Sequence, residues 1–124
     1  MKIVEINEKK YIIDPFGGIK GLKLKQRLIK TLAPAFKSFK AEETTEDQSF
    51  GFIIDAIEHV IENSTDDEIF NILVDLMTGV KTENGNINFD EEFKKNYSTL
   101  YKLAKEVIVE NYSDVFQALG MNVV

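Results

Sequence analysis

The single histidine of the chain, His59, lies near three carboxylates that could suggest a general base or a metal ligand. Asp55, Glu58 and Glu62 all fall within four residues of it. Either role requires side chains that converge in a cleft. Helical spacing instead places these residues on one polar face, away from the apolar positions of the same segment. We therefore interpret the group as the solvated face of a surface helix.

A second candidate is segment 80–91, whose later half resembles a calcium-binding EF-hand loop. The roles of turn glycine, central hydrophobic residue and bidentate carboxylate would fall on Gly85, Ile87 and Glu91. Val80 and Thr82, however, occupy the first and third ligand positions, so the carboxylate that opens such a loop is missing. The amide side chains of Asn84 and Asn88 add no charge for a hard dication. We interpret the segment as a hairpin that runs into a capped helix, with a calcium-responsive, protein-binding regulatory module as the alternative function.

Other catalytic constellations are missing from the sequence. The chain has no cysteine, which excludes a thiol nucleophile, a Cys-ligated zinc ion and a disulfide framework. The glycine-rich stretch 17–21 lacks the Lys-Ser/Thr ending of a phosphate-binding loop, so we interpret it as a turn. We therefore predict a protein that is not an enzyme, has no cofactor and no metal ligands, and acts by binding other macromolecules.

Length and composition predict one compact domain over 1–124. The chain has 124 residues, 44% of them hydrophobic, which is enough to bury a core without disulfides or a metal. No stretch approaches the roughly 20 apolar residues of a membrane span, and the first residues lack the apolar run of a signal peptide. We expect a cytoplasmic protein that does not contact membranes.

The net charge of −6 is unevenly distributed along the chain. Residues 1–40 contain ten Lys or Arg against three Asp or Glu, a net +7, so the remaining residues carry −13. No nucleic-acid-binding motif accompanies the basic segment, and the acidic remainder repels a polyphosphate, so we expect no nucleic-acid partner. The split predicts a homo-oligomer in which the basic third of one copy meets the acidic remainder of another. A solvated charged surface and docking onto an acidic partner are the alternatives.

The spacing of apolar residues predicts the elements of the N-terminal part. Residues 1–16 contain two short runs of alternating apolar residues joined by a polar stretch, which indicates a β-hairpin. Over 21–39 the spacing becomes helical, and we expect Pro34 to divide that helix because proline removes a backbone donor. The polar and acidic residues 41–48 predict an exposed loop.

Helices predominate in the body, 49–124. Apolar residues at helical spacing predict one amphipathic helix over 50–62 and a second over 69–77. The second is apolar nearly all round, so we expect it to be central to the core. Thr65 and Glu68 have the spacing of a capping box at its start.

The C-terminal part begins with a second predicted hairpin, because Asn84-Gly85 suits a type I′ turn. A long helix should then run from Asp90 to about Asn111, and a short terminal helix should follow Ser113. The predicted fold is α+β and mainly α, with an N-terminal β-hairpin, a helical bundle and a small second hairpin before a long C-terminal helix.

The C-terminal stretch also carries the most specific pattern in the sequence. It combines the hairpin, an aromatic-rich helix and the ending Asn111-Tyr112-Ser113-Asp114-Val115-Phe116. This combination resembles the tail assembly chaperones of long-tailed bacteriophages, in which an Asn-aromatic-x-Asp-x-Phe ending recurs. The N-terminal hairpin followed by helices is similar to members from phages of Gram-positive hosts.

The resemblance implies a non-catalytic function. Members of that family bind the tape measure protein, a long, largely helical and aggregation-prone chain, and help the tail tube protein to polymerise around it. The resemblance therefore implies the tape measure protein as partner, the tail tube protein as a second client, and the host cytoplasm as the place of action.

The long helix carries more apolar side chains than one core-facing stripe needs. We predict that the surplus forms a groove for an amphipathic helix of the client, while the acidic body keeps the complex in solution. The candidate partner-binding residues are Phe93, Tyr97, Leu100, Tyr101, Ala104 and Ile108. We expect Tyr112 and Phe116 in the core, where the terminal helix must dock.

Overall fold

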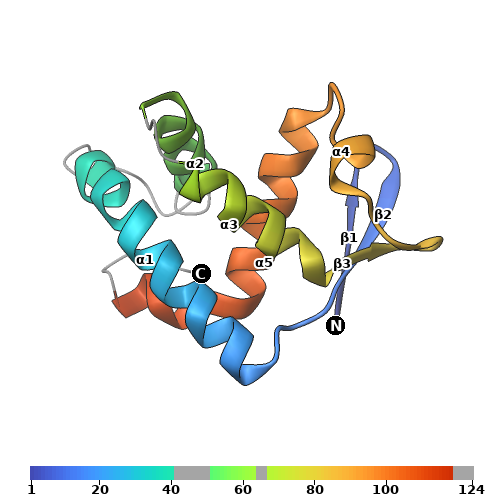
Figure 1. The fold of residues 1–124 in the computed structure, drawn as a ribbon, viewed down its shortest axis with the longest axis horizontal. Coiled ribbons are helices and arrows are strands. Elements are labelled where there is room, and N and C mark those ends of the chain that lie inside the picture. The colour runs from blue at the N-terminus through green and yellow to red at the C-terminus, as the bar shows by residue number, and fades with distance from the viewer. Residues whose placement is uncertain (41–50, 64–66, 119–124) are drawn as a thin grey trace.

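The structure is a computed structural model that describes residues 1–40, 51–63 and 67–118, with side chains described for 1–31, 57–63 and 67–112. It is an α+β fold, mainly helical, with both predicted hairpins and a long C-terminal helix (Figure 1). The elements are β1 (Lys2–Ile6), β2 (Lys9–Ile13), α1 (Gly18–Lys40), α2 (Gly51–Asn63), α3 (Glu68–Leu76), the 3₁₀ turn η2 (Met77–Gly79), β3 (Val80–Thr82), β4 (Gly85–Asn86), α4 (Phe89–Glu92) and α5 (Tyr97–Ala118).

The N-terminal hairpin is regular along its whole length. All five residues of β1 have a partner in β2, from Lys2 opposite Ile13 to Ile6 opposite Lys9. Asn7 has φ 52° and the residue after it φ 68°, the left-handed pair that a type I′ turn requires. Such a turn twists in the same sense as the strands, so the hairpin closes without a bulge.

The two hairpins join into a single antiparallel sheet with the order β1-β2-β3-β4. The join is made where Ile12 and Ile13 of β2 pair with Lys81 and Val80 of β3. Thr82 pairs with Gly85, so residues 83 and 84 form the turn from β3 into β4, and Gly85 follows it with φ 100°. The predicted type I′ turn at Asn84-Gly85 is therefore wrong, because Asn84 does not have the positive φ that such a turn requires. In Figure 1 the sheet lies on one side of α5, and α1 and α2 lie on the other.

One hydrophobic core unites the sheet and the helices. Tyr11, Ile13 and Val80 of the sheet are buried, and the buried residues of α5 and α3 pack against them. Polar contacts fix β1 on α5: Lys2 Nζ lies 2.8 Å from Glu106 Oε2. The prediction of a single domain over 1–124 stays a prediction, and its loop at 41–48 lies outside the described residues. The predicted capping box of Thr65 and Glu68 is wrong, because α3 begins at Glu68 with Asp67 as its N-cap and without a side-chain cap bond.

The long C-terminal helix begins at Tyr97, so the predicted start at Asp90 is wrong. A separate short helix, α4, precedes it, with the Asn88 side chain as N-cap. The chain then turns through Lys95, whose φ of 55° is left-handed. This break brings Phe93, which is 2% exposed, into the core. Burying a whole aromatic side chain stabilises the fold more than continuing the helix through this stretch would.

Two further expectations concern helix continuity. α1 runs as one helix from Gly18 to Lys40, so the predicted division at Pro34 is wrong; a long helix tolerates the loss of one backbone donor. In α5 the backbone leaves helical geometry at Tyr112 (φ −132°, ψ 22°), near the predicted end of the long helix. Tyr112 is 6% exposed, which confirms its place in the core. The Phe116 side chain lies outside the described part.

Candidate partner-binding surface

The structure separates the six candidate partner-binding residues into two groups. Four of them lie in the core and are at most 5% exposed: Phe93, Leu100, Ala104 and Ile108. Tyr97 is 62% exposed, and Tyr101 is half-buried. The partner-binding role of the six stays a prediction, but in this structure only Tyr97 and Tyr101 can touch a partner directly.

Tyr97 and Tyr101 lie one turn apart at the start of α5, and Tyr101 lies near the acidic residues of α2. Burial, and then the negative charges of Glu58 and Glu62, raise the pKa of Tyr101. The phenol is neutral near pH 7, as tyrosine ordinarily is, so its hydroxyl can donate a hydrogen bond. Glu58 and Glu62 are themselves exposed. The arrangement offers aromatic rings, a hydroxyl donor and carboxylates to one incoming segment.

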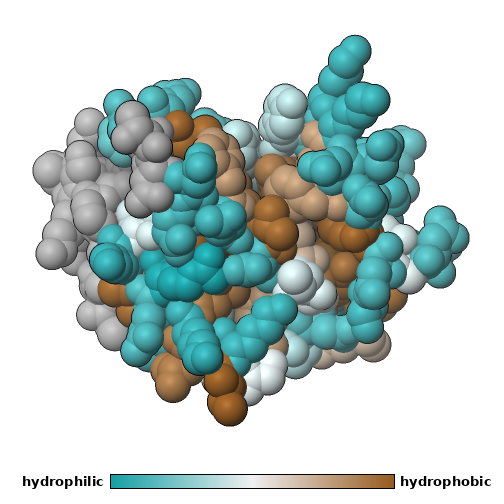
Figure 2. Space-filling view, in the orientation of Figure 1, coloured by the Kyte–Doolittle hydropathy of each residue, from teal (hydrophilic) through white to brown (hydrophobic). Residues whose placement is uncertain are grey.

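α3 adds apolar side chains to the surface. Phe70 and Val74, one helical turn apart, are 48% and 45% exposed, whereas the opposite side of the helix is buried. The expectation that α3 is central to the core therefore holds for one side of it only. Figure 2 shows apolar side chains in a hollow across the middle of this face, and α3 contacts both α2 and α5.

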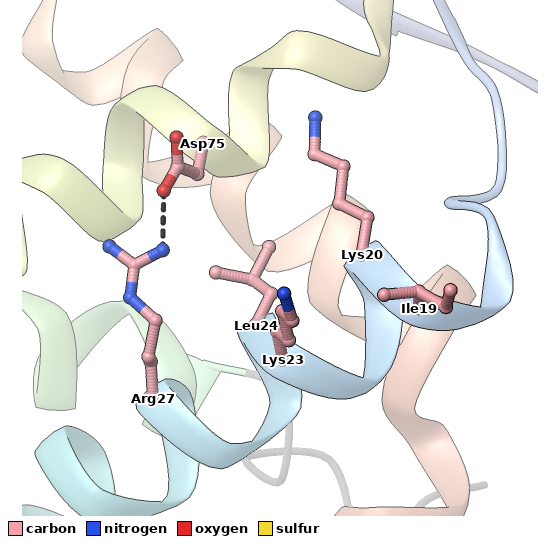
Figure 3. A pocket seen from close by; sticks show the side chains of 6 residues that line it. All are labelled: Ile19, Lys20, Lys23, Leu24, Arg27 and Asp75. Carbon is pink, nitrogen blue, oxygen red and sulfur yellow. Dashed lines mark hydrogen bonds and ion pairs between the residues drawn. The ribbon is translucent and has the colours of Figure 1, made fainter.

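A second hollow lies between α1 and α3, with a volume of about 430 Å³ (Figure 3). Arg27 bridges the two helices: its Nε is 2.7 Å from Glu68 Oε1, and its Nη1 contacts Asp75. Lys20 and Lys23 stand along the same face of α1, and Lys20 contacts the hydroxyl of Thr78. The hollow has cationic walls, so an acidic side chain fits it better than a basic one.

At least three of the ten basic residues of 1–40 form ion pairs inside one molecule. Lys2 pairs with Glu106, Lys9 with Glu92 at 2.7 Å, and Arg27 with Glu68 and Asp75. Each pair joins the basic first third to the acidic remainder of the same chain. Head-to-tail self-association through these charges stays a prediction, with fewer cations available for it.

The EF-hand-like segment folds as β3, a turn and β4, followed by α4. The Asn88 side chain accepts from the backbone N–H of Glu91 at 3.1 Å, which is the bond of a helix N-cap. The Thr82 hydroxyl accepts from the backbone N–H of Asn84 at 3.2 Å. Among the residues whose positions are described, no group of three His, Cys, Asp or Glu side chains is placed to hold a metal ion.

Millimolar calcium is expected to leave the thermal midpoint unchanged. Two of the oxygens that an EF-hand would use already accept backbone hydrogen bonds, and the first ligand position is Val80. Thermal unfolding with and without calcium checks this. A calorimetric isotherm in the micromolar range would contradict it, and Asn84, Asn88 and Glu91 would then be the first ligands to replace.

His59 lies on α2 with an exposed side chain, as do Glu58 and Glu62. The amide nitrogen of Asn63 is 3.3 Å from its Nδ1. The Asp55 side chain lies outside the described part. This geometry matches a solvated helix face.

Comparison with known sequences identifies a protein family. The sequence model of a family described as "Phage tail assembly chaperone protein, TAC" matches residues 7–122, all but the first six and last two residues. No curated protein and no solved structure matches the chain. In the described ranges, no helix is long and apolar enough to cross a membrane.

Proposed function

Because the chain belongs to the phage tail assembly chaperone family, we propose that it binds the tape measure protein during tail assembly and limits its aggregation, without catalysing a reaction. The tail tube protein is a second proposed client, and the host cytoplasm is the proposed place of action. The N-terminal hairpin followed by helices supports the type found in phages of Gram-positive hosts.

The observation that carries this proposal is an aromatic pair on α5: Tyr97, which is exposed, and Tyr101, which is half-buried and lies near Glu58 and Glu62. An aggregation-prone helical client presents apolar stripes that must be covered. Tyrosine suits that task because it has a large ring, little side-chain entropy to lose and a polar tip. The neighbouring carboxylates favour a client helix whose apolar stripe is bordered by Lys or Arg.

Co-expression with the tape measure protein is expected to raise the soluble yield of that protein, and the two should co-purify. Replacing Tyr97 with glutamate should weaken the complex at least about tenfold, because the change removes a ring and adds a negative charge to the proposed client surface. Tyr97 is 62% exposed, so the thermal midpoint of the chaperone itself should hardly change. Titration calorimetry measures the affinity.

Ile19→Glu is the matched control. Ile19 is 76% exposed on α1 and lines the cationic hollow, so the same added charge there should leave tape measure binding intact. Loss of binding in Ile19→Glu but not in Tyr97→Glu would contradict the aromatic surface and assign the client to the α1–α3 hollow. Equal insolubility of the client with and without the chaperone would contradict the proposed function itself.

A further inference from the structure

β1 lies at the end of the strand order, so one of its two edges faces no other strand of the described chain. Edge strands in soluble proteins are commonly protected by a bulge, a proline or an outward lysine. β1 has five regular pairs, no bulge and no proline. Its lysine, Lys2, is held by Glu106, and Ile3 is 62% exposed.

The type I′ turn determines which backbone groups of β1 point outward. In a two-residue hairpin of this type the residues beside the turn, Ile6 and Lys9, exchange both of their hydrogen bonds. Hydrogen-bonded and non-hydrogen-bonded pairs alternate from there. Val4 therefore bonds to β2, whereas the N–H and C=O groups of Ile3 and Glu5 point away from it.

The pairing of β2 with the rest of the sheet supports this assignment. The backbone N–H of Asp14, just after β2, donates to the carbonyl of Gly79 at 2.9 Å. The groups of Asp14, and by alternation those of Ile12, therefore face β3. The backbone groups of Ile13, which lies between them, face β1, in agreement with the pattern set by the turn.

The outward groups of Ile3 and Glu5 have no hydrogen-bond partner among residues 1–40, 51–63 and 67–118. Donors and acceptors at such an edge can be satisfied by another extended strand. An antiparallel partner strand must itself present free N–H and C=O groups at every second residue. A second copy of β1 does so, because its own Ile3 and Glu5 have the same spacing.

We propose that two copies of the chain pair antiparallel through β1, with the two-fold axis at Val4. In this register Ile3 lies opposite Glu5 of the second copy, and Glu5 opposite its Ile3. Each of these pairs exchanges both of its N–H···O bonds. Both four-stranded sheets continue into one sheet across the dimer. The interface goes beyond the proposed client binding and does not depend on it.

This contact differs from the charge-driven association in two measurable ways. An isologous two-fold contact closes at a dimer, whereas head-to-tail contacts form rings or open chains. Backbone hydrogen bonds are also little affected by salt, while exposed charges are screened beyond about 8 Å at physiological ionic strength. One strand pair buries less than a standard interface, so we expect a weak dimer that requires high protein concentration.

Glu5→Pro tests the interface, with Glu5→Ala as matched control. Both changes remove the carboxylate, but only proline removes the outward N–H, and proline is tolerated where a strand N–H faces solvent. Because of the two-fold symmetry, the substitution removes two intermolecular hydrogen bonds, one for each copy, so Glu5→Pro should weaken the dimer about tenfold or more. Glu5→Ala should dimerise like the parent chain. Light scattering over a concentration series, at low and high salt, gives the mass.

Amide hydrogen exchange provides a second readout that needs no substitution. The amides of Ile3 and Glu5 should become slower to exchange as concentration rises, while that of Val4, bonded to β2, should not change. A monomer at every concentration would overturn the proposal. Assemblies larger than a dimer that dissociate as the salt concentration rises would also contradict it. So would protection of the Ile3 and Glu5 amides that arises only after the tape measure protein is added.

Discussion

Replacing Ile108 with alanine is expected to lower the free energy of unfolding by about 2–5 kcal/mol. Ile108 is fully buried on α5 within the core that joins the sheet and the helices. Its truncation removes apolar contacts and leaves a cavity that a close-packed interior cannot collapse completely. Urea unfolding followed by circular dichroism measures the change, with an unaltered dependence on denaturant as a check on two-state behaviour.

Tyr97→Ala is the control for this experiment, because both residues belong to the predicted partner-binding set. Tyr97 is largely exposed, so its removal should change the free energy of unfolding by no more than about 0.5 kcal/mol. The pair thus separates the core function of α5 from its surface function. Unchanged stability in Ile108→Ala, together with loss of the client, would contradict the burial of Ile108 and restore it to the groove.

Local patterns were sufficient to predict most of the elements. Alternating apolar residues predicted the first hairpin, and Asn84-Gly85 predicted the second hairpin but not its turn, which lies one residue earlier in the chain. The pairing of β2 with β3 was not predicted, because it joins Ile12 to Lys81 across most of the chain and no local pattern specifies such a contact. The break before α5 was missed because residues 90–95 are compatible with a helix, and only the burial of Phe93 decides against it.

The candidate surface was predictable only in part. The apolar excess of α5 was real, but the helix is covered on several sides, by β1 as well as by α2 and α3, so a wide arc of it is core. Sequence spacing cannot show how many neighbours a helix has, and Leu100, Ala104 and Ile108 were therefore assigned to a groove. The exposure of Phe70 was not predicted. α3 is apolar nearly all round, so its sequence does not indicate which side faces solvent.

Glu92 is a polar anchor between α4 and the first hairpin. Its side chain is 14% exposed and accepts from Lys9 Nζ at 2.7 Å and from the Tyr11 hydroxyl at 2.8 Å. Tyr11 is 1% exposed, so its hydroxyl has little access to water if the carboxylate is removed. Glu92→Ala is therefore expected to lower the free energy of unfolding by about 1–3 kcal/mol, the cost of leaving a buried donor unsatisfied.

Ionisation of Glu92 makes the free energy of unfolding depend on pH. Burial alone would raise the pKa of Glu92, but the hydrogen bonds from Lys9 and Tyr11 and the charge of Lys9 lower it below 4.5. The pKa of Glu106 is lowered in the same way. Burial would raise that pKa, but the hydrogen bond from Lys2 and the charge of Lys2 lower it by more. A carboxyl with a lowered folded pKa stabilises fully above its ordinary pKa. That contribution shrinks as pH falls below 4.5 and is lost below the folded pKa.

Glu92→Gln tests this dependence, because glutamine keeps an acceptor for Tyr11 but cannot titrate. We expect the variant to be less stable than the parent chain at pH 7 and to lose less stability between pH 7 and pH 3, so the two curves converge in acid. Glu91→Gln, an exposed neighbour on the same short helix, should follow the parent curve. Parallel curves for Glu92→Gln and the parent would mean that the negative charge of Glu92, and with it the ion pair to Lys9, contributes nothing to stability in solution. The position of α4 would then rest on the hydrogen bond from Tyr11 and on the packing of Phe89 and Phe93 with the hydrophobic core.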